Sequence, residues 1–236
     1  MSITKLADVR KEDVATVGGK AANLGELIGM GMPVPDGCVV TDSHFNATAV
    51  YHGFISLDST LVAVRSSGIA EDGLTASMAG QHDTFLYCDA SSVIQAVGDC
   101  FESVNNPRAI AYREENGITE DRIAVIVQRM IDPLYSGVLF TADPVDGDTT
   151  KMVVEWVEGT GEKLVSGEVI PNSAEIHDVG HLRSIRLDLF DIPNVKALAQ
   201  AARDIEGHFG CPQDIEWCVD KENKLWILQA RPITTL

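Results

Sequence analysis

The sequence predicts an α+β fold, and three of its segments indicate this class. The run from Ile123 to Met130 is apolar until its polar end, which is typical of a buried strand. The segments Asp214 to Val219 and Leu225 to Arg231 flank a short polar loop, which is the pattern of a β-hairpin. Residues 21–30 carry leucine and isoleucine at helical spacing, and Gly31 then ends the pattern.

The remaining segments mix strands and helices along the whole chain. We expect further strands at Cys38–Thr41, Leu61–Arg65, Ser136–Thr141 and Met152–Trp156, and helices at residues 91–116 and Asn194–Phe209. This order predicts two lobes that meet near residue 120, an N-terminal lobe of residues 1–120 and a C-terminal lobe of residues 121–236.

Composition narrows the class of function. The chain has 35 acidic and 18 basic residues and a formal net charge of −17, whereas a nucleic-acid surface needs clustered Lys and Arg. An acidic shell still permits a locally basic nucleotide cleft. The five cysteines form no Cys-x-x-Cys pair, which favours a reducing, cytoplasmic compartment over disulfides or a zinc ribbon. No apolar run reaches the ~18 residues of a membrane span, so we expect neither nucleic acid nor membrane as partners.

The C-terminal hairpin carries the most informative polar side chains. Because strand side chains alternate between faces, Asp214 and Glu216 share one face of the first strand. On the second strand Gln229 and Arg231 share a face, together with Leu225 and Ile227. Carboxylate and amide oxygens suit Mg²⁺, and an arginine beside them suits a phosphate. A solvated hairpin face with an Arg231–Glu216 salt bridge is the alternative interpretation.

Two basic residues stand where a phosphate could bind. Lys20 follows a glycine pair at the start of a helix, and a helix N-terminus attracts anions. A glycine turn with a surface lysine is the alternative. Arg65 ends an apolar strand, so it needs an anionic partner, either a ligand phosphate or a carboxylate such as Glu71 or Asp72.

Seven segments of the chain follow one another in the order of a known motif series. They are Val17–Leu24, Val34–Gly37, Val64–Ser67, Ala79–Leu86, Val127–Met130, Ser136–Pro144, and Gln213–Trp217 together with Leu228–Pro232. In this order they resemble the N-terminal ATP-binding domain of phosphoenolpyruvate synthase, pyruvate phosphate dikinase and rifampin phosphotransferase. The similarity covers nearly the whole chain.

The resemblance implies an ATP-grasp-like fold in which ATP and Mg²⁺ are held between two lobes. It gives Lys20, Arg65 and Arg231 phosphate-contacting, catalytic roles. In the first lobe, Gly80 and Thr84 match the family's phosphate loop. The resemblance assigns the adenine and metal contacts to residues 121–236. It places the adenine at Gln128 and Met130. It places Mg²⁺ and phosphates at Glu216, Gln229 and Asp214.

The sequence departs from the family pattern in two places. The stretch Asp42–Thr60 is much shortened, so we expect a reduced first lobe. The chain also stops just after Arg231–Ile233, where the family continues into a domain with a phosphorylatable histidine. We therefore expect the acceptor histidine on a separate domain or subunit.

Three functions fit these observations. The first is the ATP-binding component of a dikinase-type phosphotransferase that passes a phosphoryl group from ATP to a histidine of a partner. The second is a self-sufficient small ATP-grasp kinase or ligase acting on a small molecule. The third is a non-catalytic nucleotide-binding regulatory subunit.

Overall fold

The computed structural model describes residues 3–41, 43–69, 72–73, 76–77, 83–116, 122–161, 164, 167, 169–177 and 194–234. The chain divides into two compact units, each with its own sheet. Unit 1 comprises Met1–Gly31 and Pro35–Met130, and unit 2 comprises Met32–Val34 and Ile131–Leu236. The chain therefore leaves unit 1 after Met130, whereas the sequence suggested a boundary near residue 120.

Unit 1 is built on a five-stranded sheet in which every neighbouring pair is antiparallel. Its strand order is β1 (Ile3–Lys5), β2 (Gly37–Val40), β7 (Ile123–Arg129), β3 (Val62–Gly68) and β6 (Thr84–Cys88). The central strand β7 is buried along nearly its whole length, which explains its continuous apolar sequence. A short separate pair consists of β4 (Asp72–Gly73) and β5 (Ala76–Ser77).

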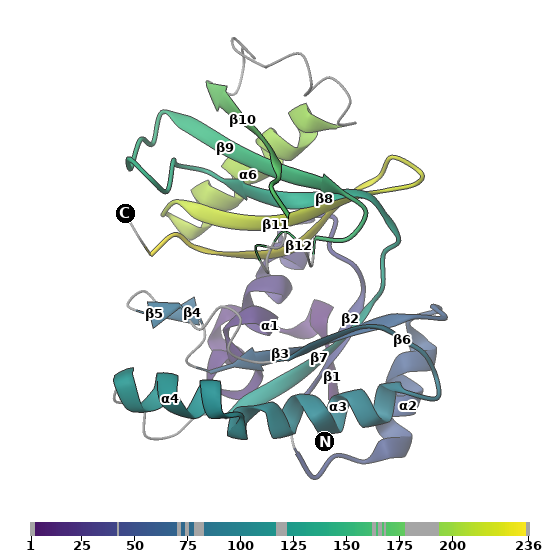
Figure 1. Ribbon diagram of the computed structural model, residues 1–236. Helices are drawn as coiled ribbons and strands as arrows, with labels where there is room; N and C mark the ends of the chain where they lie inside the picture. The colour runs from purple at the N-terminus through teal and green to yellow at the C-terminus, as the bar shows by residue number, and fades with distance from the viewer. Residues whose placement is uncertain are drawn as a thin grey trace. The chain divides into compact units, whose positions relative to one another are not determined.

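Helices cover both faces of this sheet. The helices α2 (Ala47–Ser56) and α3 (Val93–Glu102) pack on the face that carries Val64 and Val127. The kinked helix α1 (Val14–Gly29) contacts β3 and β7 on the opposite face, where Ile126 is buried. Figure 1 shows α1 and α3 on opposite sides of the sheet. This alternation follows from the two-residue period of the strands.

The helix expected over residues 91–116 is two helices, α3 and α4 (Pro107–Asn116), joined by the 3₁₀ turn Ser103–Asn105. Asn106 has an extended backbone, with φ of −62° and ψ of 142°. Proline disfavours a helical conformation in the residue that precedes it, so Pro107 ends one helix and begins the next.

Unit 2 contains a second antiparallel five-stranded sheet with one long helix against it. The strand order is β10 (Asn172–His177), β9 (Lys151–Glu158), β8 (Pro133–Phe140), β11 (Gln213–Asp220) and β12 (Leu225–Pro232). The helix α6 (Val195–Phe209) contacts β11 and β12 (Figure 1). Its buried side chains Leu198, Ala202 and Ile205 recur at helical spacing and form the apolar stripe that such packing requires.

The hairpin of β11 and β12 contains a β-bulge that the sequence pattern did not predict. Glu216 pairs with Gln229, but the next residue, Trp217, pairs with Ile227, so Leu228 is the extra residue. One extra residue reverses the alternation of faces beyond it. The expectation that Leu225 and Ile227 share a face with Gln229 and Arg231 is therefore wrong.

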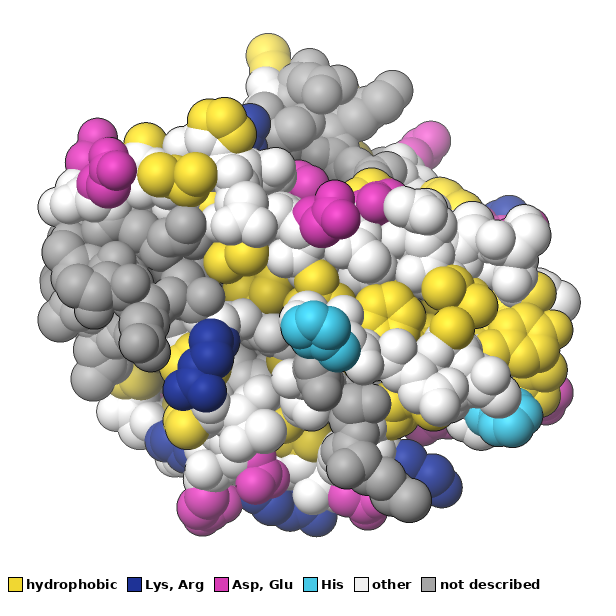
Figure 2. All heavy atoms as spheres, turned by 90° about the horizontal axis from the view of Figure 1, so that it is seen from below, with side chains coloured by type: hydrophobic (Ala, Val, Ile, Leu, Met, Phe, Trp, Pro, Cys, Tyr) yellow, Lys and Arg dark blue, Asp and Glu magenta, His cyan; other side chains and the backbone are white. Residues whose placement is uncertain are grey.

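Charged side chains of both signs lie on the face of the molecule that Figure 2 shows. In the view from below, Lys and Arg side chains are scattered among acidic, apolar and uncharged ones (Figure 2). Within the described ranges, no helix combines the length and the apolar character that crossing a bilayer requires.

Candidate functional site

A glycine fixes the path of α1 where it passes the end of β3. Gly18 has φ of 78° and ψ of 165°, and it divides α1 into two helical segments. Only glycine adopts this backbone region without strain. A Cβ atom added at Gly18 would lie 2.1 Å from the backbone oxygen of Ser67, so glycine is also required by the close approach of α1 to β3.

Ser67 caps the helical segment that begins after Gly18. Its side-chain oxygen accepts a hydrogen bond from the backbone N–H of Ala21 at 3.0 Å, and the serine is fully buried. The first N–H groups of a helix have no partner within the helix, and a hydroxyl commonly satisfies one of them. The helix N-terminus proposed as an anion site therefore has one of its donors occupied by the protein itself.

Lys20 is buried beside this cap. Only 7% of the residue is exposed, and its ammonium donates a hydrogen bond to the backbone oxygen of Ser66 at 3.0 Å. A buried lysine is costly unless it is paired or has a functional partner. The alternative interpretation of Lys20 as a surface lysine is therefore wrong. The hydrogen bond to Ser66, near the end of β3, fixes the position of the Lys20 ammonium.

Arg65 and Thr84 are direct neighbours across two strands. Arg65 is half-buried in β3 and pairs with Thr84, the exposed first residue of β6. Since Val64 faces α3, the alternation of the strand places Arg65 on the same face of the sheet as α1. Gly80, the other expected phosphate-loop residue, lies outside the described residues, as do Glu71 and the side chain of Asp72.

The two residues expected at the adenine lie at the end of β7. Gln128 is 2% exposed, and its amide donates a hydrogen bond to the backbone oxygen of Pro35 at 3.0 Å. Met130 is half-buried, and its backbone N–H donates to the oxygen of Leu61 at 3.0 Å. Both residues thus hold neighbouring segments of unit 1 together, and Gln128 has at least one amide donor engaged within the protein.

Unit 2 brings together the four polar residues singled out in the hairpin. The β11–β12 register pairs Asp214 with Arg231 and Glu216 with Gln229, so all four side chains share one face. Asp214 is 8% exposed and Gln229 is buried, whereas Glu216 and Arg231 are half-buried. The expected common face of these four residues is confirmed, because the register is regular from Asp214 to Glu216 and the bulge lies beyond them.

Asp214 and Arg231 form a tight ion pair within this face. The Nε and Nη2 atoms of Arg231 both donate to Oδ2 of Asp214, at 2.9 and 2.6 Å. Within the described part of the chain, the other carboxylate oxygen, Oδ1, is buried without a hydrogen-bond partner. Burial raises the pKa of Asp214 above its usual range, although the Arg231 guanidinium offsets part of that rise.

The donor set can be compared with what Mg²⁺ requires. Among the residues that the structure describes, no group of three or more His, Cys, Asp or Glu side chains is arranged so that it could hold a metal ion. Mg²⁺ is usually bound by one or two carboxylates plus waters and substrate phosphates, so such a cluster is not needed. The paired side chains of Glu216 and Gln229 offer a carboxylate and an amide oxygen on one face, and this chemistry fits the metal.

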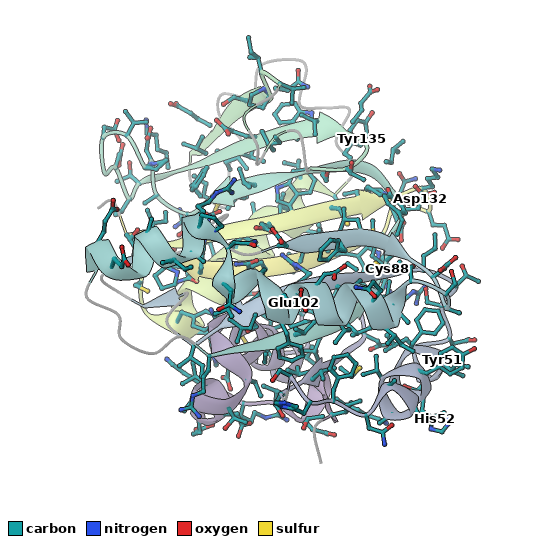
Figure 3. The ribbon with its side chains drawn as sticks, turned by 60° about the horizontal axis from the view of Figure 1, so that its bottom comes forward. Tyr51, His52, Cys88, Glu102, Asp132 and Tyr135 are labelled. Carbon is teal, nitrogen blue, oxygen red and sulfur yellow. The ribbon has the colours of Figure 1, made fainter. Side chains whose placement is uncertain are left out.

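Four of the five cysteines are buried thiols with raised pKa values. All five are free, and burial raises the pKa of Cys38 to about 11 and those of Cys100 and Cys218 to about 12. Cys88, labelled in Figure 3 with Glu102 and Tyr51, is also buried, and burial raises its pKa. A thiolate is the reactive form, so these four residues are core residues.

Two contacts were not anticipated from the sequence. The first is the cap that Ser67 places on the helix of Lys20, and the second is the pairing of Asp214 with Arg231. The Ser-Ser pair that follows Arg65 is the only sequence signal for the first contact, because hydroxyls at the end of a buried strand need partners. For the second contact, knowing the strand register would have sufficed.

Comparison with known proteins shows the family to which the chain belongs. The family model described as pyruvate phosphate dikinase, AMP/ATP-binding domain, matches residues 48–187 and 186–236. A probable phosphoenolpyruvate synthase of Archaeoglobus fulgidus is 33% identical over 318 aligned positions, which include all of this chain and 42% of the relative. A rifampicin phosphotransferase of Streptomyces sviceus is 34% identical over 313 positions, covering 99% of this chain and 36% of the relative.

These alignments are longer than the chain, so the relatives contain internal segments that this protein lacks. The chain also spans only about two-fifths of the length of these two relatives. Among solved structures, D-alanyl-alanine synthetase A of Vibrio cholerae matches 91% of this chain and 58% of its own, with a TM-score of 0.50 and 11% identity. The fold is α+β and ATP-grasp-like, and the chain belongs to the family of pyruvate phosphate dikinase AMP/ATP-binding domains.

Proposed function

We propose that this chain binds ATP with Mg²⁺ and is the ATP-binding component of a dikinase-type phosphotransferase. The acceptor in this proposal is a histidine on a separate domain or subunit. The observation that carries the proposal is the polar face of β11 and β12, where Asp214 pairs with Arg231 and Glu216 with Gln229. Phosphoryl transfer needs charge neutralisation and positioning more than covalent help, and this face supplies both.

Unit 1 contributes the second set of residues in this proposal. Lys20 and Arg65 contact phosphate oxygens, with Gly80 and Thr84 forming the phosphate loop. The burial of Lys20 and its bond to Ser66 support this role, because a preorganised cation loses little conformational freedom on binding. Residues at the end of β7, Gln128 and Met130, hold the adenine in the same proposal.

Magnesium fits the hairpin face through Glu216 and Gln229. When bound, Mg²⁺ neutralises charge on the phosphate oxygens and so favours transfer. Arg231 lies beside that pair, two positions from Gln229 on the same face, and its planar fork can contact two phosphate oxygens. Within unit 2, this face therefore offers a cation beside the proposed metal ligands.

The products of ATP turnover distinguish a dikinase from a simple kinase. In the proposed reaction the β-phosphoryl group passes to the histidine nitrogen, AMP leaves, and water takes up the γ-phosphoryl group as inorganic phosphate. The chain is incubated with Mg²⁺ and either β- or γ-labelled ATP, together with a soluble extract of its source cells. We expect acid-labile, base-stable protein label from β-labelled ATP alone, and none with the Arg231→Met variant. Label from γ-labelled ATP alone, with ADP as product, would contradict the proposal.

The same experiment distinguishes two other functions from the proposed one. Acceptor-dependent ADP formation by the chain alone would indicate a self-sufficient small kinase or ligase. One observation favours a non-catalytic regulatory subunit, because the alignments show that internal segments of the relatives are missing here. Such a subunit would bind ATP without turnover in the extract. In either case we propose a cytoplasmic location, which fits five free cysteines.

A further inference from the structure

We propose that Asp214 is a positioning residue for Arg231 and does not itself bind the metal. Its carboxylate fixes the plane of the Arg231 guanidinium, which in turn contacts the phosphates. The inference rests on the proposed function, and it separates the four hairpin residues into two pairs with different tasks. Glu216 and Gln229 hold Mg²⁺, whereas Asp214 acts only through Arg231.

The geometry of the ion pair is the first reason. Two donors of Arg231, Nε and Nη2, reach the same oxygen, Oδ2 of Asp214, at 2.9 and 2.6 Å. These two atoms lie on one edge of a rigid, planar group. Holding that edge therefore fixes the direction of the whole guanidinium. A lysine in place of Arg231 could not be held in this manner, because an ammonium has no plane.

Accessibility is the second reason. A metal ligand needs an oxygen that an ion can reach, but Oδ2 of Asp214 is shared by two arginine donors and Oδ1 is buried. Glu216 is half-buried on the same face and is directly paired with Gln229. Asp214 is the more buried of the two carboxylates, and a metal ion could reach its Oδ2 only by breaking the 2.6 Å contact with Arg231.

Hydrogen bonds hold the N-terminal end of β11, the strand that carries Asp214, and a positioning role requires such a rigid base. The residue before it, Gln213, donates its backbone N–H to the hydroxyl of Thr141 at 2.8 Å. The same hydroxyl donates to Glu206 of α6 at 3.0 Å, and Glu206 is also bound by Arg203 at 2.7 Å. The start of β11 is therefore tied to both β8 and α6. A carboxylate on such a rigid base can orient its partner within the small tolerance that catalysis needs.

Metal and nucleotide binding are measured separately to test the inference. Mn²⁺ replaces Mg²⁺ so that bound metal can be followed by electron paramagnetic resonance in the presence of a saturating non-hydrolysable ATP analogue. The variants are Asp214→Asn, which keeps the shape of the side chain, and Glu216→Gln as its matched control. Circular dichroism and the melting temperature establish that each variant is folded.

We expect Asp214→Asn to weaken binding of the analogue by about tenfold while the Mn²⁺ midpoint stays within about twofold of wild type. Glu216→Gln is expected to raise the Mn²⁺ midpoint by about tenfold or more. If Asp214→Asn raises the Mn²⁺ midpoint as much as Glu216→Gln does, Asp214 is a metal ligand and the inference is wrong.

A double-mutant cycle with Arg231→Met provides an independent readout. If Asp214 acts only through Arg231, the double variant Asp214→Asn/Arg231→Met binds the analogue no more weakly than Arg231→Met alone. Additive losses would overturn the inference while leaving ATP binding by this face intact. The double variant removes the guanidinium together with the carboxylate that it contacts. It therefore still provides the comparison if Asp214→Asn alone does not fold. Failure of the wild type to bind the analogue at all would instead remove the proposed function.

Discussion

The ammonium group of Lys20 donates a hydrogen bond to the backbone oxygen of Ser66, 3.0 Å away, although 46 positions separate the two residues. Ser66 directly follows Arg65 in β3, so one short stretch of strand positions both basic candidates of unit 1. The neighbouring Ser67 caps the helix that carries Lys20. The packing of α1 on β3 is therefore the feature of unit 1 on which its proposed phosphate-binding role depends.

Replacing Gly18 with alanine should damage this contact severely. The added Cβ would lie 2.1 Å from a backbone oxygen, and the positive φ of the residue would also be strained. We expect Gly18→Ala to lower the free energy of unfolding by about 3 kcal/mol in a urea titration. Gly98→Ala in α3 is the matched control, because a Cβ there meets no atom within 4 Å. It should raise stability by up to about 1 kcal/mol. Equal effects of both variants would contradict the packing described.

Removing the helix cap should have a smaller effect of its own. Ser67→Ala leaves the Ala21 N–H without its acceptor, and we expect a loss of about 1 kcal/mol in unfolding free energy. Because the cap fixes the helix that carries Lys20, ATP binding should weaken as well. The control is Ser56→Ala, whose exposed hydroxyl donates to the backbone of its own helix. A Ser67→Ala protein with unchanged stability would refute the capping role.

The carboxylates around the buried Lys151 should govern stability in acid. The Lys151 ammonium lies 2.6 Å from Asp143 and 3.1 Å from Glu175, and hydrogen bonding to Lys151 lowers the pKa of Asp143. The stabilisation from Asp143 is complete above the carboxyl's ordinary pKa of about 4, and it is lost as the pH falls through the lower pKa of the folded state. Urea titrations of the wild type should therefore show stability falling steeply below about pH 4.

In Lys151→Met the pKa of Asp143 is no longer lowered by the ammonium. We expect lower stability at pH 7, because a buried carboxylate loses its partner, and a shallower decline in acid. Lys221→Met is the control, since the Lys221–Asp132 pair is two-thirds exposed. An acid limb of unchanged slope in Lys151→Met would show that this cluster does not control it.

Thiol reactivity should single out one cysteine. Four of the five are buried and have raised pKa values, whereas Cys211 is half-buried in the turn before β11. With a disulfide reagent under native conditions, we expect one thiol to react rapidly and four to react only after unfolding. Cys211→Ser should abolish the rapid phase. Persistence of that phase in the variant would place the accessible thiol elsewhere.

Much of the candidate site follows from the two-residue period of strands. That period alone places Asp214 with Glu216 and Gln229 with Arg231, and the register then joins the two pairs. It fails beyond Gln229, because Trp226, Ile227 and Leu228 are all apolar and no polar residue marks the bulge. The sequence also did not predict that β7 belongs to unit 1, because a strand that is apolar on both faces does not indicate which sheet it joins.

The burial of the Lys20 side chain could not be predicted from the sequence either. Nothing near Lys20 predicts that it packs under a carbonyl 46 positions away, because that contact requires the path of α1 over β3. In contrast, the break between α3 and α4 could have been predicted from the Asn106–Pro107 pair. Features that depend on neighbouring residues could thus be predicted from the sequence, whereas contacts between distant segments could not.

Calorimetric titration with ATP in excess Mg²⁺ tests the central claim most directly. The wild type, Arg65→Met and Arg231→Met are compared, with Arg108→Met on the exposed surface of α4 as control. We predict one ATP bound per wild-type chain, unchanged binding by the control, and a loss of about tenfold or more in each of the other two variants. Wild-type affinity in both Arg65→Met and Arg231→Met, or no binding by the wild type, would contradict the claim that these residues bind ATP.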